Sequence, residues 1–349
     1  MWQDYFTQHG YLEQTAGWQL ALEGLLGEAL TPVAFPEKAS WKAMTKDGHM
    51  LLQHSELQEH MAEAAAASFG RAISKLLASE QLTMPDGLRQ SLASMRTFTD
   101  TPEEAAAFFA LLLQQADARI HAFAEARGLH ETGLRLLGWA VVDALVPAEA
   151  KDAAVWEEIG WKRNYCPVCG RPPVLAVLRK EQQGRARFLV CDGCHTVWPY
   201  ARVGCAYCGN QDLEKMKVLE PEGEEEMRLD VCEECHTYLK TYQGGKQMDP
   251  KAPDGPDASE IIYRHDWATI HLDLLAREQG LVKRGSVLLA AAPVFDEGEE
   301  SKWHKKWQCC TTSRAAAPAG PAWLPASSGM TCRLTCRPRS RVSTSRMPH

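Results

Sequence analysis

Residues 166–237 read CPVCG at 166–170, CDGCHT at 191–196, CAYCG at 205–209 and CEECHT at 232–237. Each motif holds two cysteines separated by two residues, a knuckle whose spacing lets both thiolates point at the same ion. Four sulfurs complete a tetrahedral centre, so four knuckles in one short stretch are a strong signal for metal binding. The pattern predicts eight metal ligands: Cys166, Cys169, Cys191, Cys194, Cys205, Cys208, Cys232 and Cys235.

The four knuckles form an internal repeat. CPVCG recurs as CAYCG, and CDGCHT recurs as CEECHT, so that each repeat contains one knuckle of each kind. Sequential pairing places the four cysteines of residues 166–194 in one centre and the four of residues 205–235 in another. A cross-braced pairing of alternate knuckles is the open alternative.

Sulfur ligands at all four positions would make each centre closed, and closed centres are structural or electron-transferring rather than hydrolytic. We expect two metal ions per chain, iron or zinc, since a sulfur-only tetrahedron suits both. His195 and His236 follow a ligand in each repeat, and we interpret both as packed or exposed side chains rather than ligands. The remaining cysteines lack knuckle spacing and receive no ligand role: Cys309, Cys310, Cys332 and Cys336.

The predicted fold class is α+β: a helical N-terminal domain followed by two tandem rubredoxin-like or zinc-ribbon metal modules and a C-terminal helix. The expected boundaries are 1–155 for the helical domain, 160–202 and 203–246 for the first and second four-cysteine metal ribbons, and 259–285 for the C-terminal helix. Residues 248–256 are rich in Pro, Gly and Asp and predict a linker.

Two start signals mark helices inside the N-terminal domain. Ser55-Glu56-Leu57-Gln58 has the pattern of a capping box. Thr101-Pro102 predicts a Thr cap with Pro at the first helical position, and we expect this helix to continue to Gly128. Its apolar stripe indicates the core of a helix bundle.

Residues 296–349 differ from the rest of the chain. Their last 49 residues carry nine Lys or Arg, no Asp or Glu, scattered Trp and Cys, and no apolar periodicity. We interpret this segment as a basic disordered tail or as the product of a shifted reading frame, without a fold of its own.

The composition excludes several classes of protein. The 45% of hydrophobic and 24% of charged residues are typical of a globular protein. Nine of the 38 Lys and Arg lie in residues 301–349, so residues 1–300 carry 29 basic and 45 acidic side chains, a formal charge of −16. An acidic body argues against general affinity for nucleic acid. The sequence shows neither an apolar run long enough to span a bilayer nor a secretory signal, and we expect a cytoplasmic protein without membrane association, whose cysteines stay reduced.

The order of the motifs resembles the FdhE family of formate dehydrogenase accessory proteins. The resemblance rests on CPVCGRPP at 166–173, on Trp198 after the second knuckle, on Tyr238 and Lys240 after the fourth, and on the segment Asp266–Asp273. It implies a helical domain joined to two rubredoxin-like metal modules. It also implies a cytoplasmic role in the maturation of respiratory formate dehydrogenase, through binding of the catalytic subunit rather than catalysis.

Three functions fit the residues themselves. A protein-binding maturation factor is favoured by the acidic body and by the lack of a nucleophile, base or phosphate-loop motif, so we assign no catalytic residues and no organic cofactor. A zinc ribbon that binds nucleic acid is disfavoured, because residues 160–245 contain twelve basic and twelve acidic side chains. A rubredoxin-like redox carrier requires iron. The oligomeric state, including a homodimer, stays open.

Overall fold

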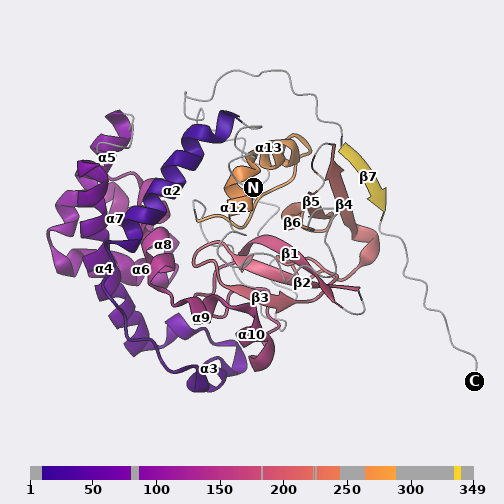
Figure 1. The fold of residues 1–349 in the computed structure, drawn as a ribbon, viewed down its shortest axis with the longest axis horizontal. Coiled ribbons are helices and arrows are strands. Elements are labelled where there is room, and N and C mark those ends of the chain that lie inside the picture. Colours follow the sequence, from indigo (N-terminus) through magenta and orange to yellow (C-terminus); the bar gives the residue numbers. More distant parts are fainter. Residues whose placement is uncertain are drawn as a thin grey trace, which may run out of the picture.

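The computed structural model describes residues 10–79, 86–181, 184–222, 224, 226–243, 264–287 and 334–338. Within them, a group of helices lies on one side of the molecule and a mixed β-sheet on the other (Figure 1). Two short helices close over the sheet. This arrangement confirms the predicted fold class.

Helices are the only regular elements in the described part of residues 10–159. They are η1 (Gly10–Leu12), α2 (Glu13–Gly27), α3 (Lys38–Met44), η2 (Lys46–Gly48), η3 (Leu51–Gln53), α4 (Ser55–Ala78), α5 (Asp86–Thr99), α6 (Pro102–Leu113), α7 (Asp117–Ala126), α8 (Glu131–Leu145), α9 (Ala148–Lys151) and α10 (Ala153–Ile159). None of the described helices is long and apolar enough to cross a bilayer.

Helix α4 is the centre of the helical core. Its residues Met61, Phe69 and Ile73 are fully buried. Their spacing places them on one face of the helix, and this face forms the core. Phe69 meets Phe109 of α6 edge-on, with 5.4 Å between ring centroids, and further Phe rings extend this cluster into α5 and α7. The apolar stripe predicted from the sequence is therefore bundle core.

Two details of the helices differ from the sequence expectations. The expected capping box is wrong: Ser55 is the first residue of α4, and the preceding residue, His54, makes no side-chain cap hydrogen bond. The side-chain amide of Gln58 donates instead to the carbonyl of Leu52 at 2.9 Å. The helix expected from Pro102 to Gly128 is also divided, because Gln115 adopts a left-handed φ of 52° between α6 and α7. Gly128, with φ of 62°, lies directly beyond the end of α7 as expected.

One seven-stranded sheet joins the two cysteine repeats, in the order β3-β2-β1-β6-β5-β4-β7. The first repeat supplies β1 (Pro173–Glu181), β2 (Gly184–Cys191) and β3 (Val197–Tyr200), and the second supplies β4 (Met216–Pro221), β5 (Met227–Cys232) and β6 (Thr237–Tyr242). Within each repeat the strands are antiparallel. The repeats meet where β1 and β6 run parallel, with Leu175 opposite Lys240. The two ribbons thus share one sheet.

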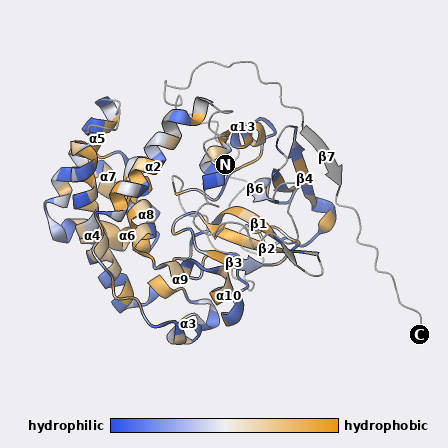
Figure 2. Cartoon of the chain, in the orientation of Figure 1, coloured by the Kyte–Doolittle hydropathy of each residue, from blue (hydrophilic) through white to orange (hydrophobic). Residues whose placement is uncertain are grey.

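The central strands of this sheet are buried on both faces, and the apolar colour of β1 in Figure 2 reflects that position. One face packs against α13, whose Leu272 and Ala276 are fully buried in the same cluster as Leu175 and Val177. The other face is continuous with the helical core, because Ala176 and Leu189 belong to the cluster that contains Phe69.

The C-terminal helix predicted within 259–285 is two helices, α12 (Arg264–Ala268) and α13 (Ile270–Glu278). They are separated at Thr269, whose φ and ψ of −108° and 40° are not helical. Gly280, with φ of 73°, follows the end of α13. The predicted linker at 248–256 lies outside the described residues.

Buried charges attach these helices to the sheet. Lys240 of β6 is fully buried and lies 2.5 Å from Asp266 and 3.0 Å from Asp273. Lys283 contacts the same two carboxylates at 2.8 and 3.1 Å, and the Tyr238 hydroxyl donates to Asp273 at 2.7 Å. Burial by itself raises the pKa of Asp266, but the two ammonium groups outweigh it and lower that pKa to about 2.

Strand β7 (Leu334–Pro338) pairs antiparallel with β4. It lies within the predicted tail, and it pairs with the edge of β4, where an added strand satisfies backbone groups of that edge. The rest of the predicted tail at 296–349 lies outside the described residues.

We predict that Lys240→Met lowers the free energy of unfolding by about 3–5 kcal/mol, because it leaves two partly buried carboxylates with one counter-charge. Urea unfolding followed by circular dichroism measures the change. Lys75→Met is the matched control, since Lys75 pairs with Glu28 at the surface and its removal is expected to leave stability unchanged. An equal effect of both substitutions would contradict a stabilising role for the buried network.

Candidate metal centres

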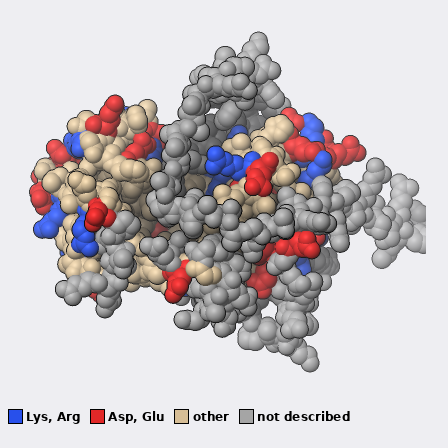
Figure 3. All heavy atoms as spheres, turned by 90° about the horizontal axis from the view of Figure 1, so that it is seen from above, with Lys and Arg blue, Asp and Glu red and all other residues tan. Residues whose placement is uncertain are grey.

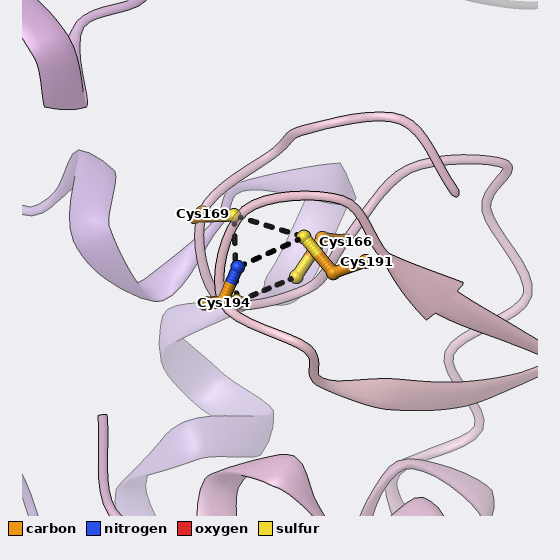
Figure 4. A group of neighbouring side chains, drawn as sticks. All are labelled: Cys166, Cys169, Cys191 and Cys194. Atoms are coloured by element: carbon orange, nitrogen blue, oxygen red, sulfur yellow. Dashed lines mark hydrogen bonds between the residues drawn. The ribbon is translucent and has the colours of Figure 1, made fainter. Parts of the chain in front are cut away.

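The first group of cysteines comes from two loops. Cys166 and Cys169 lie between α10 and β1, and Cys191 and Cys194 lie at the turn between β2 and β3. All four are buried, and their side chains point toward one another (Figure 4). The sulfurs of Cys166 and Cys194 are 3.5 Å apart, and those of Cys169 and Cys191 are 3.4 Å apart.

The second group repeats this arrangement with the other four cysteines. Cys205 and Cys208 precede β4, and Cys232 and Cys235 lie at the turn between β5 and β6. The sulfurs of Cys205 and Cys235 are 3.6 Å apart, and those of Cys208 and Cys232 are 3.8 Å apart. Within each group all sulfurs lie within 4.8 Å of one another. The grouping follows the sequential pairing, not the cross-braced one.

The backbone conformation beside the cysteines is also the same in the two groups. Gly170 and Gly209 have φ of 78° and 72°, and each donates its N–H to the carbonyl of the first cysteine of its knuckle, at 2.9 and 3.1 Å. His195 and His236 have φ of 52° and 53°. A left-handed residue after each knuckle turns the chain sharply enough to bring both of its sulfurs to one side.

Hydrogen-bond donors face several sulfurs. In the first group, the N–H of Gly193 lies 3.3 Å from the sulfur of Cys191, and the hydroxyl of Thr196 lies 3.1 Å from that of Cys194. In the second, Thr237 takes the same position at 2.9 Å from Cys235. Such donors offset thiolate charge and orient ligands. No role was predicted for Thr196 and Thr237, although the tripeptide Cys-His-Thr that contains them is present in both repeats.

Both groups have the dimensions of a metal centre. A tetrahedron with metal–sulfur bonds of about 2.3 Å has edges of about 3.8 Å, close to the sulfur separations observed. Such a donor set can hold zinc or iron.

The histidines beside the knuckles lie outside both groups. His195 directs its Nδ1 toward Asp143 of α8, 2.9 Å from the carboxylate oxygen, and Lys151 contacts the same carboxylate at 2.7 Å. His236 is exposed, and its carbonyl accepts the N–H of Val282 at 2.8 Å. Of the cysteines without an assigned role, Cys336 lies in β7, and the other three lie outside the described residues.

The first group is packed against the helical region. The N–H groups of Leu51 and Leu52 in η3 donate to the carbonyls of Pro167 and Val168, at 3.0 and 2.9 Å. From the turn between α6 and α7, the side chain of Gln115 donates to the carbonyl of Cys169 at 2.9 Å.

A buried ion pair borders the same group. The guanidinium of Arg171 meets the carboxylate of Asp192 through two hydrogen bonds of 2.6 and 2.7 Å. It also donates to the carbonyl of Ser286 at 3.0 Å and lies over the ring of Trp139, 5.0 Å from the centroid. Arg171 therefore connects the first knuckle to the second, to α8 and to the segment after α13.

Comparison with known proteins relates this geometry to a family. Residues 165–202 match the family model described as FdhE, central domain. The FdhE homolog of Aquifex aeolicus is 34% identical over 133 residues, which are 38% of this chain and 44% of that protein. The homolog of Stutzerimonas stutzeri is 36% identical over 131 residues, 37% of this chain and 39% of that protein.

The FdhE protein of Escherichia coli K12 is 31% identical over 148 residues, 42% of each chain. A crystal structure of the FdhE protein from Pseudomonas aeruginosa matches at 23% identity with a TM-score of 0.30, covering 76% of this chain and 100% of that one. The chain spans about two fifths of the length of the curated relatives it matches. The resemblance that the cysteine motifs predicted is confirmed, with residues 165–202 matching the central domain of the FdhE family.

Proposed function

We propose that this protein is an accessory factor for the maturation of respiratory formate dehydrogenase, that it binds the catalytic subunit of that enzyme in the cytosol, and that it catalyses no reaction. The observation that carries the proposal is the pair of four-cysteine groups, the first of which lies within a match to the FdhE family. The formate dehydrogenase partner is proposed from the resemblance to FdhE, and the binding role from the cysteine groups and the charges of this chain.

The eight cysteines are the proposed ligands of two metal ions. Four sulfurs around each ion leave no coordination position for a substrate, so the centres would support the fold or carry electrons rather than hydrolyse a bond. The ions would act first as cross-links between loops, since each group joins the two ends of a hairpin. Family resemblance and closed coordination thus agree on a binding role.

The charge distribution favours a protein partner over nucleic acid. On the face shown in Figure 3, acidic and basic side chains of the described residues lie close together. The side chains of the sheet region are also paired, as in the contacts of Lys215 with Glu234 and Lys217 with Glu233. Nucleic-acid affinity depends on unpaired basic groups that replace condensed counterions.

We predict that the purified chain contains two metal ions. Elemental analysis beside a quantitative protein assay measures the ratio, and a visible absorption band distinguishes iron from zinc. Cys169→Ser and Cys208→Ser should each reduce the content to one ion, because each removes a ligand from a different group. A reproducible ratio near one in the unaltered chain would contradict the two-centre proposal.

The partner is tested by capture of the catalytic subunit. Immobilised full-length chain should retain formate dehydrogenase catalytic subunit from a cytosolic extract, and it should restore formate-dependent dye reduction in cells that lack their own FdhE. The double variant Cys169→Ser, Cys208→Ser is the control, since loss of both centres should abolish retention. Retention of DNA at physiological salt in place of the subunit would favour the zinc-ribbon alternative, and reversible reduction of bound iron without capture would favour the redox carrier.

A further inference from the structure

The two cysteine groups have the same local fold but different surroundings. Around the first group, a Cβ added at Gly170 would lie 2.4 Å from the terminal methyl carbon of Met50. A Cβ added at Gly193 would lie 2.8 Å from the ring of Trp139. Side chains of the helical region therefore pack closely against both knuckles of this group.

The equivalent surface of the second group is not covered in this way by the described residues. A Cβ at Gly209, the counterpart of Gly170, would meet no described atom within 4 Å. The counterpart of Gly193 is Glu234, which is exposed. Cys208 and Cys235 are correspondingly only half-buried, whereas all four cysteines of the first group are buried.

The charged residues beside the two groups also differ in burial. The first group is bordered by the ion pair of Arg171 and Asp192, whose side chains are 1% and 0% exposed. The repeat places Asn210 and Glu233 at these two positions in the second group. Glu233 pairs instead with Lys217 at the surface. Exposed pairs contribute little stability, so this pair holds its knuckle only weakly to the rest of the molecule.

This difference in burial affects how reagents reach the two groups. Reagents reach metal-bound sulfur only through an exposed atom or after local opening, and opening is easier where fewer buried contacts are broken.

We propose that the two centres have separate roles: the first is a permanent structural centre covered by the helical region, and the second is exchangeable, giving its ion to a thiol or chelating ligand that approaches over Cys208 and Cys235. The exchange is ligand substitution, in which each metal–sulfur bond is replaced by a bond to the incoming donor. The freed thiolate takes up a proton from water, and no electron is transferred.

The experiment uses the zinc-loaded full-length chain with the chromogenic chelator 4-(2-pyridylazo)resorcinol in excess. Zinc release should follow two phases of equal amplitude, with rate constants that differ at least about tenfold, because only the second centre exchanges without opening the helix–sheet contact. In Cys208→Ser the fast phase should be absent and the slow phase unchanged. One phase for both ions, or loss of the slow phase in this variant, would overturn the proposal.

Met50→Ala provides the matched variant on the first centre, since it uncovers Gly170 without altering a ligand. It should accelerate the slow phase and leave the fast phase as it is. Glu234→Ala, at the exposed counterpart of Gly193, should leave both phases unchanged. Acceleration of the fast phase by Met50→Ala, or no effect of that substitution on either phase, would contradict the role assigned to the helical cover.

Alkylation gives an independent readout on the unaltered protein. Iodoacetamide forms a carbon–sulfur bond with a freed thiolate and releases iodide, and peptide mass spectrometry locates the modified cysteines. Cys208 and Cys235 should be modified before Cys169 and Cys191. The reverse order would refute the proposal even if every variant failed to fold. Elemental analysis before either assay shows how many zinc ions the chain holds. A content of one zinc ion per chain would contradict the proposal that there are two centres.

Discussion

The contact between the first CPVCG knuckle and the helical region is the constraint on which the rest of the structure depends. Backbone bonds from Leu51 and Leu52 fix the knuckle from one side, and the amide of Gln115 fixes it from another. The four cysteines of the first group then position β1, β2 and β3, since the knuckles stand at the ends of those strands. Because β1 pairs with β6, the second repeat is placed by the first.

One sequence repeat thus produces two different environments. The knuckle geometry is local, set by left-handed residues and by Thr hydroxyls near sulfur, and it is the same in both repeats. The surroundings are not local. Met50 and Trp139 come from the helical region, and among the described residues they press on the first repeat. The same cysteine motif is therefore fully buried in the first repeat and partly exposed in the second.

The sequence could predict the parts of the fold that depend on short-range chemistry. Cysteine spacing indicated both cysteine groups and their sequential pairing, and the apolar stripe of the helix that begins at Pro102 indicated the core of the helix bundle. The break at Gln115 could not be predicted, because a Gln in the left-handed region is selected by its contact with Cys169, far away in the chain. The joining of the ribbons through β1 and β6 was missed for the same reason.

Arg171 shows how such long-range contacts decide the difference between the repeats. Its position in the knuckle is equivalent to that of Asn210, and both residues accept the N–H of the first cysteine through their backbone carbonyl, at 3.0 and 2.8 Å. Only their side chains differ. Burying a guanidinium costs several kcal/mol unless it is paired and fully hydrogen-bonded, and Asp192 and the Ser286 carbonyl supply those partners. The ring of Trp139 in α8 and the segment beyond α13 thus complete the surroundings of the first group, although in both groups the cysteines come from the two ends of one hairpin.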